Sequence, residues 1–147
     1  IKDLKQGLHG RNEIDAFKKI KKFPKKNNIR LTDLVLLKIY PSLIENNFNE
    51  FSKAITKLQN IMGNYFNVLQ GGVFSSQAVS GVLSFLEKEN IIGYGQTSWG
   101  PSGFAFFPNI KKAEQMKTKL KKRFSSCNNL EFIICSGKNS GADIQFK

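Results

Sequence analysis

The spacing of apolar residues predicts a run of helices in the first part of the chain. Ile14, Phe17 and Ile20 recur at steps of three, which predicts a short helix over residues 12–22. That helix should end before Pro24, because the residue before a proline avoids the helical region. The following "KKNN" is predicted to be a loop.

A second helix is predicted over residues 33–45, "DLVLLKIYPSLIE", with Thr32 as its N-cap. Apolar residues lie almost all round this helix, which predicts that it is buried. Pro41 should kink or split it, because proline lacks the backbone N–H that a helix needs.

The longest helix should start at Asn47 or Asn49. Its apolar stripe is the best periodic signal in the chain and comprises Phe48, Phe51, Ile55, Leu58, Met62, Tyr65 and Leu69. Gly71 should end it in the usual glycine C-terminal position. The "SSQ" that follows predicts the start of another helix, which ends near Asn90. Its buried stripe should be Val79, Val82, Leu83 and Leu86.

The pattern then changes to strands. Residues 91–96 and 103–107 read as two strands around a loop, and Pro108-Asn109 should cap a further helix. One side of that helix should carry Ile110, Ala113, Met116, Leu120 and Phe124. "LEFIICS" (130–136) and "ADIQF" (142–146) predict a second hairpin about a "GKNSG" turn. The order of elements predicts an α+β fold, with an antiparallel sheet covered by helices on one face.

Length and composition narrow the classes of protein. The chain has 147 residues, 40% of them hydrophobic, which suits one domain with a real core. No apolar run is long enough to span a bilayer and no signal-peptide pattern is present, so we expect a cytoplasmic protein with no membrane partner. The chain starts without Met, which suggests a fragment or a processed chain. Cys135 lies in an apolar run and is expected in the core, and one His with two Cys argues against a zinc site.

The net charge of +12 favours a polyanionic or phosphorylated partner. The lysines cluster at residues 18–26 and 111–123. Two plainer interpretations remain: an AT-rich genome enriches Lys and Asn without functional demand, and the second cluster is the solvated face of a helix. No helix-turn-helix, RNP-type or zinc-finger pattern supports nucleic-acid binding.

The main candidate for a site is "GYGQTSWGPSGFAFF", residues 93–107. Its glycines allow successive backbone N–H groups to converge on an anion, and Trp99 could stack on an aromatic ligand. Its hydroxyl groups are on Thr97, Ser98 and Ser102. The loop runs into a strand, and its spacing matches neither phosphate-loop motif. A tight hairpin turn and a ligand loop therefore both remain open.

Three further stretches are weaker candidates. "LQGGVFSSQ" is a helix end followed by a helix start, in which Gln70, Gly71 and Gly72 could face the same pocket. "QGLHGRNE" offers His9, Arg11 and Glu13; Arg11 could hold a carboxylate or phosphate in bidentate fashion. "KNSGAD" places Asp143 at a strand start, as a turn residue or a pocket carboxylate. No Ser/His/Asp triad and no paired-carboxylate spacing is present.

Several of these pieces, in this order, resemble one family over nearly the whole chain. "GLHGRNEIDAF", "LLKIYPSLIENNFNEFSKAITKLQNIMGNYF", "LQGGVFSSQAV", "IGYGQTSWGPSGFAF" and "NSGADI" are similar to the C-terminal half of β-ribofuranosylaminobenzene 5′-phosphate synthases. These are transferases of the GHMP kinase superfamily, in archaeal methanopterin biosynthesis. The most specific piece is residues 93–102, and "YFNVLQGG" comes next.

The resemblance implies a fold, a reaction and a cofactor. The fold would be ferredoxin-like with extra helices, as in the C-terminal domain of GHMP kinases. The reaction would join phosphoribosyl pyrophosphate to 4-hydroxy- or 4-aminobenzoate with loss of pyrophosphate and CO2, and Mg²⁺ would assist in the full-length enzyme. Residues 1–147 would be one domain, the C-terminal half of a longer two-domain enzyme, inactive alone because its partner domain carries the phosphate loop. A homodimer is left open.

The resemblance also implies a set of site residues. Ser98, Trp99 and Arg11 would be the catalytic set: Ser98 orients phosphate or carboxylate oxygens, Trp99 walls the arene, and Arg11 holds its carboxylate. The substrate-binding set would be Gly93, Gly95, Gln96, Thr97, Gly100, Pro101, Ser102, Gln70, Gly71, Gly72 and Asp143, with no metal ligand among them.

Departures from the superfamily pattern keep rival functions open. Tyr94 replaces a small residue and the Gly-Gly pair of the kinase loop is absent, which favours the synthase branch over an ATP-dependent small-molecule kinase. The strand expected before the first glycine is poor, where "IKDLKQ" stands. The alternatives are a GHMP-type kinase and a basic, non-catalytic binding module.

Overall fold

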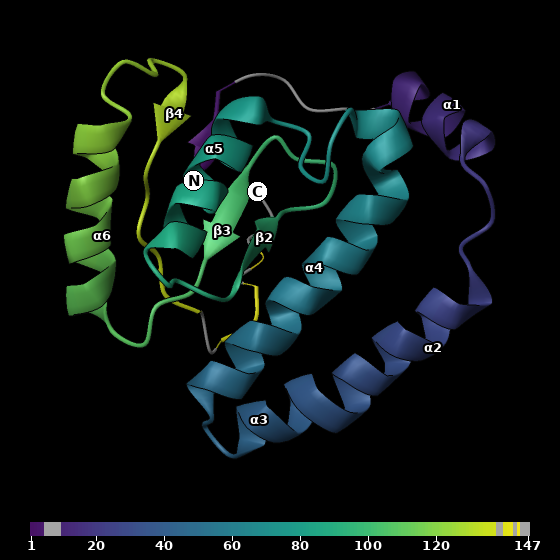
Figure 1. The fold of residues 1–147 in the computed structure, drawn as a ribbon, viewed down its shortest axis with the longest axis horizontal. Helices are drawn as coiled ribbons and strands as arrows, with labels where there is room; N and C mark the ends of the chain where they lie inside the picture. Colours follow the sequence, from purple (N-terminus) through teal and green to yellow (C-terminus); the bar gives the residue numbers. More distant parts are fainter. Residues whose placement is uncertain (5–9, 138–139, 143, 145–147) are drawn as a thin grey trace.

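A computed structural model describes residues 1–4, 10–137, 140–142 and 144 (Figure 1). The helical elements are α1 (Arg11–Lys19), α2 (Lys25–Leu34), the π-helix η1 (Val35–Ile39), α3 (Tyr40–Ile44), α4 (Phe48–Gln70), α5 (Gln77–Lys88) and α6 (Ile110–Arg123). The strands are β1 (Lys2–Asp3), β2 (Tyr94–Gln96), β3 (Gly103–Ala105) and β4 (Leu130–Glu131).

Two antiparallel strand pairs, β1–β4 and β2–β3, form the β part of the fold. The N–H of Gly103 donates to the carbonyl of Ile1 at 2.8 Å, and the nitrogen of Ile1 donates back to the carbonyl of Gly103 at 2.9 Å. Residues that exchange both bonds are antiparallel neighbours, so the strands run in the spatial order β2, β3, β1, β4. With helices between β1 and β2 and between β3 and β4, this is the ferredoxin-like arrangement. The α+β prediction is confirmed.

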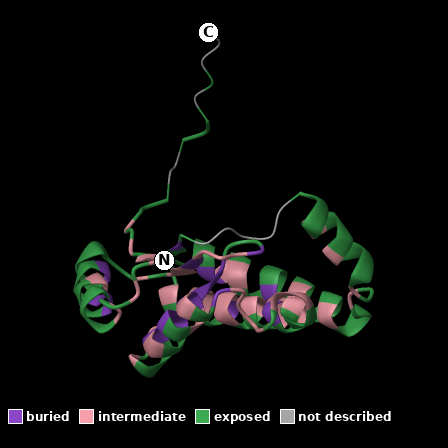
Figure 2. Cartoon of the chain, turned by 90° about the horizontal axis from the view of Figure 1, so that it is seen from above, coloured by how far each residue is buried: buried purple, intermediate pink, exposed green. Residues whose placement is uncertain are grey.

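The main core lies where α5 and α6 pack on the sheet. The predicted stripe of α5 is confirmed: Val79, Val82, Leu83 and Leu86 are at most 1% exposed. From α6, Met116 and Leu120 join them, as predicted. Ile110 is wrong as a core residue, because the buried side of α6 begins one turn later, at Ala113. Figure 2 shows the buried residues gathered in this part of the molecule, while α1 is exposed along most of its length.

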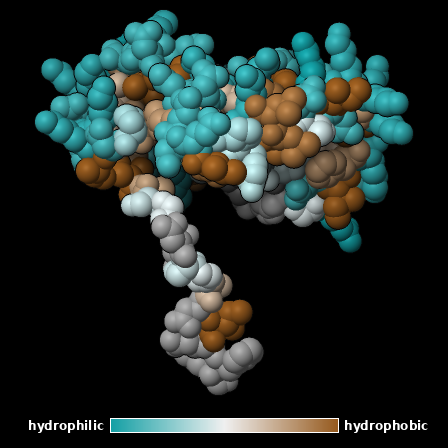
Figure 3. Space-filling model, turned by 90° about the horizontal axis from the view of Figure 1, so that it is seen from below, coloured by the Kyte–Doolittle hydropathy of each residue, from teal (hydrophilic) through white to brown (hydrophobic). Residues whose placement is uncertain are grey.

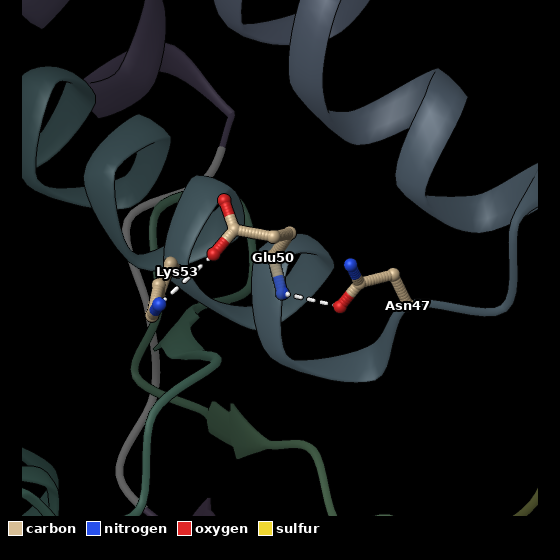
Figure 4. Close-up of polar contacts among 3 residues, drawn as sticks. All are labelled: Asn47, Glu50 and Lys53. Carbon is tan, nitrogen blue, oxygen red and sulfur yellow. Dashed lines mark hydrogen bonds and ion pairs between the residues drawn. The ribbon is translucent and has the colours of Figure 1, made fainter.

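The predicted caps are confirmed for α4 and α6. The side chain of Asn47 accepts from the N–H of Glu50 at 3.2 Å, and Glu50 also pairs with Lys53 at 2.9 Å (Figure 4). The hydrogen bond and charge of Lys53 lower the pKa of the Glu50 carboxyl. Asn109 caps α6 in the same way, and Gly71 ends α4 in the left-handed region at φ 76°. These short-range signals were readable because each cap bonds within three residues.

The predicted "KKNN" loop and the Thr32 cap are wrong. α2 begins at Lys25, directly after Pro24, whose carbonyl accepts from the N–H groups of Asn27 and Asn28. Thr32 lies inside the helix, and its hydroxyl donates to the carbonyl of Asn28 at 3.1 Å. A proline just before a helix fixes the chain direction at its start, and this outweighed the weak helix preference of Asn.

The predicted break at Pro41 is confirmed, but the predicted burial of this helix is wrong. Before Pro41 the chain forms the π-helix η1, and the hydroxyl of Ser42 donates to the carbonyls of Lys38 and Ile39. The helix packs on α4 and leaves its other side open. Its exposed apolar residues are Ile29, Val35, Leu36, Leu37, Tyr40, Leu43 and Ile44. Figure 3 shows apolar side chains on the face that α2 and α3 present.

The predicted second hairpin differs in its pairing. From the "LEFIICS" run, Leu130–Glu131 forms β4 and pairs with β1, so the "IKDLKQ" segment does supply a strand. Of the "ADIQF" run, Ala142 and Ile144 are not in a strand, while residues 143, 145 and 146 lie outside the described residues. Cys135 is exposed, contrary to the core prediction, because β4 ends before reaching it. The apolar alternation was real, but the partner strand lies at the other end of the sequence.

The pKa of Tyr94 gives a pH test of this fold. Burial, and then the charge and hydrogen bond of Glu87, raise the pKa of Tyr94 to about 12. A phenol has a pKa near 10 when unfolded, so its contribution is complete below pH 10 and is lost as the pH rises toward 12. We expect the free energy of unfolding to fall more steeply from pH 10 to 12 in the wild type than in Tyr94→Phe, by up to about 1.4 kcal/mol per pH unit. Urea titrations at each pH measure this. Tyr40→Phe, at an exposed phenol, should keep the wild-type slope; parallel slopes for wild type and Tyr94→Phe would contradict the buried position.

Candidate functional site

The side chain of Gln96 joins the two glycine-containing loops. Its Oε1 accepts from the N–H of Ser75 at 2.6 Å. Its Nε2 donates to Oε1 of Gln70 at 3.2 Å and to the carbonyl of Ser98 at 3.0 Å. Gln96 is only 9% exposed, so these bonds are made largely out of water, where leaving a polar group without a partner is costly. The carboxamide therefore fixes residues 70–75 against the hairpin loop 97–102.

Two more glutamines complete this network. Oε1 of Gln59 accepts from the backbone N–H of Gln96 at 3.0 Å. Nε2 of Gln70 donates to the carbonyls of Gly72 and Val73 at 3.0 and 2.8 Å. Both glutamines come from α4, so the long helix is the platform on which both loops are held.

The glycines of the hairpin permit close approach of other elements. A side-chain carbon on Gly95 would overlap the side chain of Gln59, and one on Gly100 (φ 73°) would overlap the hydroxyl of Ser75. Gly63 of α4 is likewise covered by Val73. Packing therefore explains these glycines at the contacts between α4, β2 and the 70–75 loop.

Most backbone N–H groups of the hairpin loop are already used within the protein. Gly93 and Tyr94 donate to the hydroxyl of Thr56. Thr97 donates to the carbonyl of Ser102, and Gly100 to that of Thr97. In the described part of the chain, no acceptor is bonded to the N–H groups of Ser98 and Trp99. An anion cradle made by the whole loop does not form; the donors that remain are at its tip.

A cavity of about 320 Å³ lies between α1, α4, the 70–75 loop and the hairpin tip. One part of its lining is apolar: Phe17, Phe66, Trp99, Met62 and Val73. The other part is polar: Gln59, Gln70, Gln96, Ser98 and Glu13. Small-molecule sites combine an apolar enclosure with a few placed polar groups, and this volume is at the lower end of their range.

The apolar wall is a cluster of three rings. Phe66 and Trp99 meet edge to face with centroids 4.6 Å apart, Phe17 and Trp99 at 5.3 Å, and Phe17 and Phe66 at 6.4 Å. Trp99 is 8% exposed, so its ring is mostly covered by these neighbours and contributes only part of its surface to the cavity. The contacts bring α1 against the C-terminal half of α4 (Figure 1).

The structure brings together four of the residues expected at a site: Gln70, Gln96, Ser98 and Trp99. The remaining expected residues that are described do not line this cavity: Arg11, Gly71, Gly72, Gly93, Gly95, Thr97, Gly100, Pro101 and Ser102. Arg11 is exposed at the start of α1. His9 and Asp143 lie outside the described residues.

Sequence reasoning missed the contribution of α4. Gln59, Met62, Gly63, Phe66 and Gln70 recur on one face of the helix and line the cavity. The signal was two glutamines and a glycine at helical spacing beside the apolar stripe. Glu13 was noticed with Arg11 but was not assigned to the site.

The largest hollow found among the described residues is elsewhere. It measures about 630 Å³ and lies between α6 and the segment around β4, with Lys117 and Lys121 at its side. It is more open than the cavity beside Trp99 and contains none of the expected site residues. We therefore regard the smaller cavity as the candidate site. Across the described ranges, no group of three or more His, Cys, Asp or Glu side chains is placed to hold a metal.

No helix in the described part of the chain is both long and apolar enough to cross a bilayer.

Comparisons with known proteins support the resemblance in the sequence. The chain is 31% identical over 99 residues to a beta-ribofuranosylphenol 5'-phosphate synthase of Methanocaldococcus jannaschii, which is 67% of this chain and 28% of that protein. It is 25% identical over 146 residues to the protein of the same name from Archaeoglobus fulgidus, which is 99% of this chain and 43% of that protein. No protein-family model and no solved structure matches.

The similarity to synthases of this kind is thus confirmed, and the chain spans less than half the length of either relative.

Replacement of Gln96 tests the network. Gln96→Leu keeps the side-chain size but leaves Ser75 N–H, Gln70 Oε1 and the Ser98 carbonyl without their partner. We expect a loss of about 3 kcal/mol in the free energy of unfolding, measured by urea denaturation. Gln115→Leu, at an exposed position of α6, is the control and should change the stability by less than about 0.5 kcal/mol. Equal stability of the two variants would show that the carboxamide does not hold the loops.

A glycine replacement tests the packing of the hairpin on α4. Gly95→Ala forces a methyl group into the side chain of Gln59 and should destabilise the fold by about 1–3 kcal/mol. The control is Gly137→Ala, because an added carbon there meets nothing within 4 Å. Thermal melting of the two variants measures the difference. A Gly95→Ala protein that melts with the wild type would mean that β2 does not approach α4 this closely.

Proposed function

We propose that this chain is part of a transferase that joins phosphoribosyl pyrophosphate to a 4-substituted benzoate. The observation that carries the proposal is the similarity to two proteins named beta-ribofuranosylphenol 5'-phosphate synthase, one of them over 99% of the chain. That name describes a phosphorylated ribofuranosyl group on a phenol, which favours 4-hydroxybenzoate as the acceptor.

The proposed reaction exchanges two bonds at two carbons. The bond from ribose C1 to the pyrophosphate oxygen breaks, and pyrophosphate leaves with the electron pair. The ring carbon that bears the carboxylate attacks C1 and forms the new carbon–carbon bond. CO2 then departs, and the electrons of its bond return to the ring. The anionic leaving group suits the positive charge of the protein, +12 over 147 residues.

Within this proposal the chain supplies the acceptor side of the site. Ser98 is exposed at the mouth of the cavity, where its hydroxyl can orient a carboxylate or phosphate oxygen. Trp99 forms part of the aromatic wall. Arg11 lies two residues before Glu13, in the first turn of α1, where it could meet an anion approaching the cavity. The described residues include no carboxylate cluster that would hold Mg²⁺, so no step here depends on the metal.

Replacement of Ser98 and Trp99 in the full-length gene product tests the assignment. Ser98→Ala and Trp99→Ala should each lower turnover at least about tenfold, which corresponds to about 1.4 kcal/mol of barrier. Release of pyrophosphate from phosphoribosyl pyrophosphate with 4-hydroxybenzoate is the readout. Because Trp99 is buried, Trp99→Phe is the variant that keeps the fold.

Thr118→Ala, at an exposed position of α6, is the control for a hydroxyl lost outside the site. Wild-type turnover in both the Ser98 and Trp99 variants would remove the loop from the active site. ATP-dependent phosphorylation of a small molecule without pyrophosphate release would favour the kinase alternative instead.

A further inference from the structure

The polar groups of the cavity beside Trp99 differ in how far they are already bonded. Both ends of the Gln70 and Gln96 carboxamides are bonded within the protein. Gln59 uses its Oε1 for the N–H of Gln96. In the described part of the chain no acceptor is bonded to Nε2 of Gln59, and no partner to the hydroxyl of Ser98. The cavity therefore offers hydrogen-bond donors at Gln59 and Ser98.

The charge in the cavity is of one sign. Glu13 is the ionisable residue in the lining, and no Lys, Arg or His joins it. A carboxylate there favours a ligand group that donates a hydrogen bond and disfavours a second carboxylate. The lining thus has an acceptor at Glu13 and donors at Gln59 and Ser98.

The space between these groups is walled by aromatic rings and a thioether. Phe17, Phe66 and Trp99 already contact each other edge to face, which is the arrangement in which a further ring packs well. Met62 adds a soft, polarisable side chain that contacts aromatic rings favourably. An aliphatic or highly charged ligand would use these groups poorly.

We propose that this cavity binds a single aromatic ring that carries a hydrogen-bond donor at one end and an acceptor at the other, and that Glu13 selects the donor end. The donor end, a phenol or an arylamine, bonds the Glu13 carboxylate, while the opposite carboxylate accepts from Gln59 and Ser98. The inference deepens the proposed function, and rests on it for the identity of the ring as the benzoate acceptor. It makes α1, and not the hairpin alone, part of the acceptor site.

The chain itself provides matched probes for this site. It has one tryptophan, Trp99, which lines the cavity, and two methionines. Met62 lines the cavity and Met116 lies in the core under α6. With the methionine methyl groups labelled with ¹³C, added 4-hydroxybenzoate should shift the Met62 signal and change Trp99 fluorescence, while the Met116 signal stays in place and reports an intact fold.

Glu13→Gln tests the choice of ligand. It should weaken binding of 4-hydroxybenzoate and 4-aminobenzoate about fivefold to tenfold, and should not weaken binding of benzoate, which has no donor opposite its carboxylate. Glu114→Gln, at an exposed acid of α6, should leave all three affinities unchanged. Titrations followed by the Met62 signal measure each affinity.

The outcomes separate this inference from the proposed function. If millimolar 4-hydroxybenzoate leaves Met62 and Trp99 unchanged, or moves Met116 equally, the ring site is not here. Equal weakening of benzoate and 4-hydroxybenzoate by Glu13→Gln would overturn the role of Glu13. Selective binding in a full-length protein that releases no pyrophosphate would keep the ring site and remove the transferase. Transfer that is indifferent to Glu13→Gln would keep the transferase and remove this site.

Discussion

The hydrogen bonds of the Gln96 side chain are the constraint on which the candidate site depends. One carboxamide bonds the 70–75 loop through Ser75 and Gln70 and the hairpin tip through Ser98. The two loops have no regular strand or helix pairing of their own, so without these bonds their relative position would rest on packing alone. A carboxamide suits this place because it donates and accepts at once, which neither a carboxylate nor an apolar side chain can do. The cavity beside Trp99 exists only while both loops stay where this group holds them.

The glycines of "GYGQTSWGPSGFAFF" have a different role from the one their number suggests. A glycine-rich loop can expose several N–H groups to an anion, but here most of those groups bond within the protein. The glycines instead let β2 lie close to α4 and let the hairpin tip meet Ser75. The two interpretations of the loop are therefore not exclusive. It is a tightly packed hairpin, and its tip, at Ser98 and Trp99, forms one wall of a cavity.

Features set by near neighbours could be predicted from the sequence, and features set by distant partners could not. The caps at Asn47 and Asn109 and the α5 stripe depend on residues within one or two helical turns, and they were readable. The pairing of β4 with β1 joins residues more than 120 positions apart, and no local pattern shows it. The exposure of α2 and α3 depends on what packs against them, which apolar periodicity alone does not contain. At the site, the hairpin attracted notice by composition, whereas Gln59 and Met62 were hidden within an ordinary amphipathic helix.

A double-mutant cycle between Gln70 and Gln96 tests the central claim most directly. The free energy of unfolding would be measured for the wild type, Gln70→Leu, Gln96→Leu and the double variant. If the two carboxamides hold the loops as one unit, the double variant should be more stable than the sum of the single losses predicts, by about 1 kcal/mol or more. Losses that add within about 0.3 kcal/mol would show that the two side chains act independently, and that the cavity does not depend on their contact.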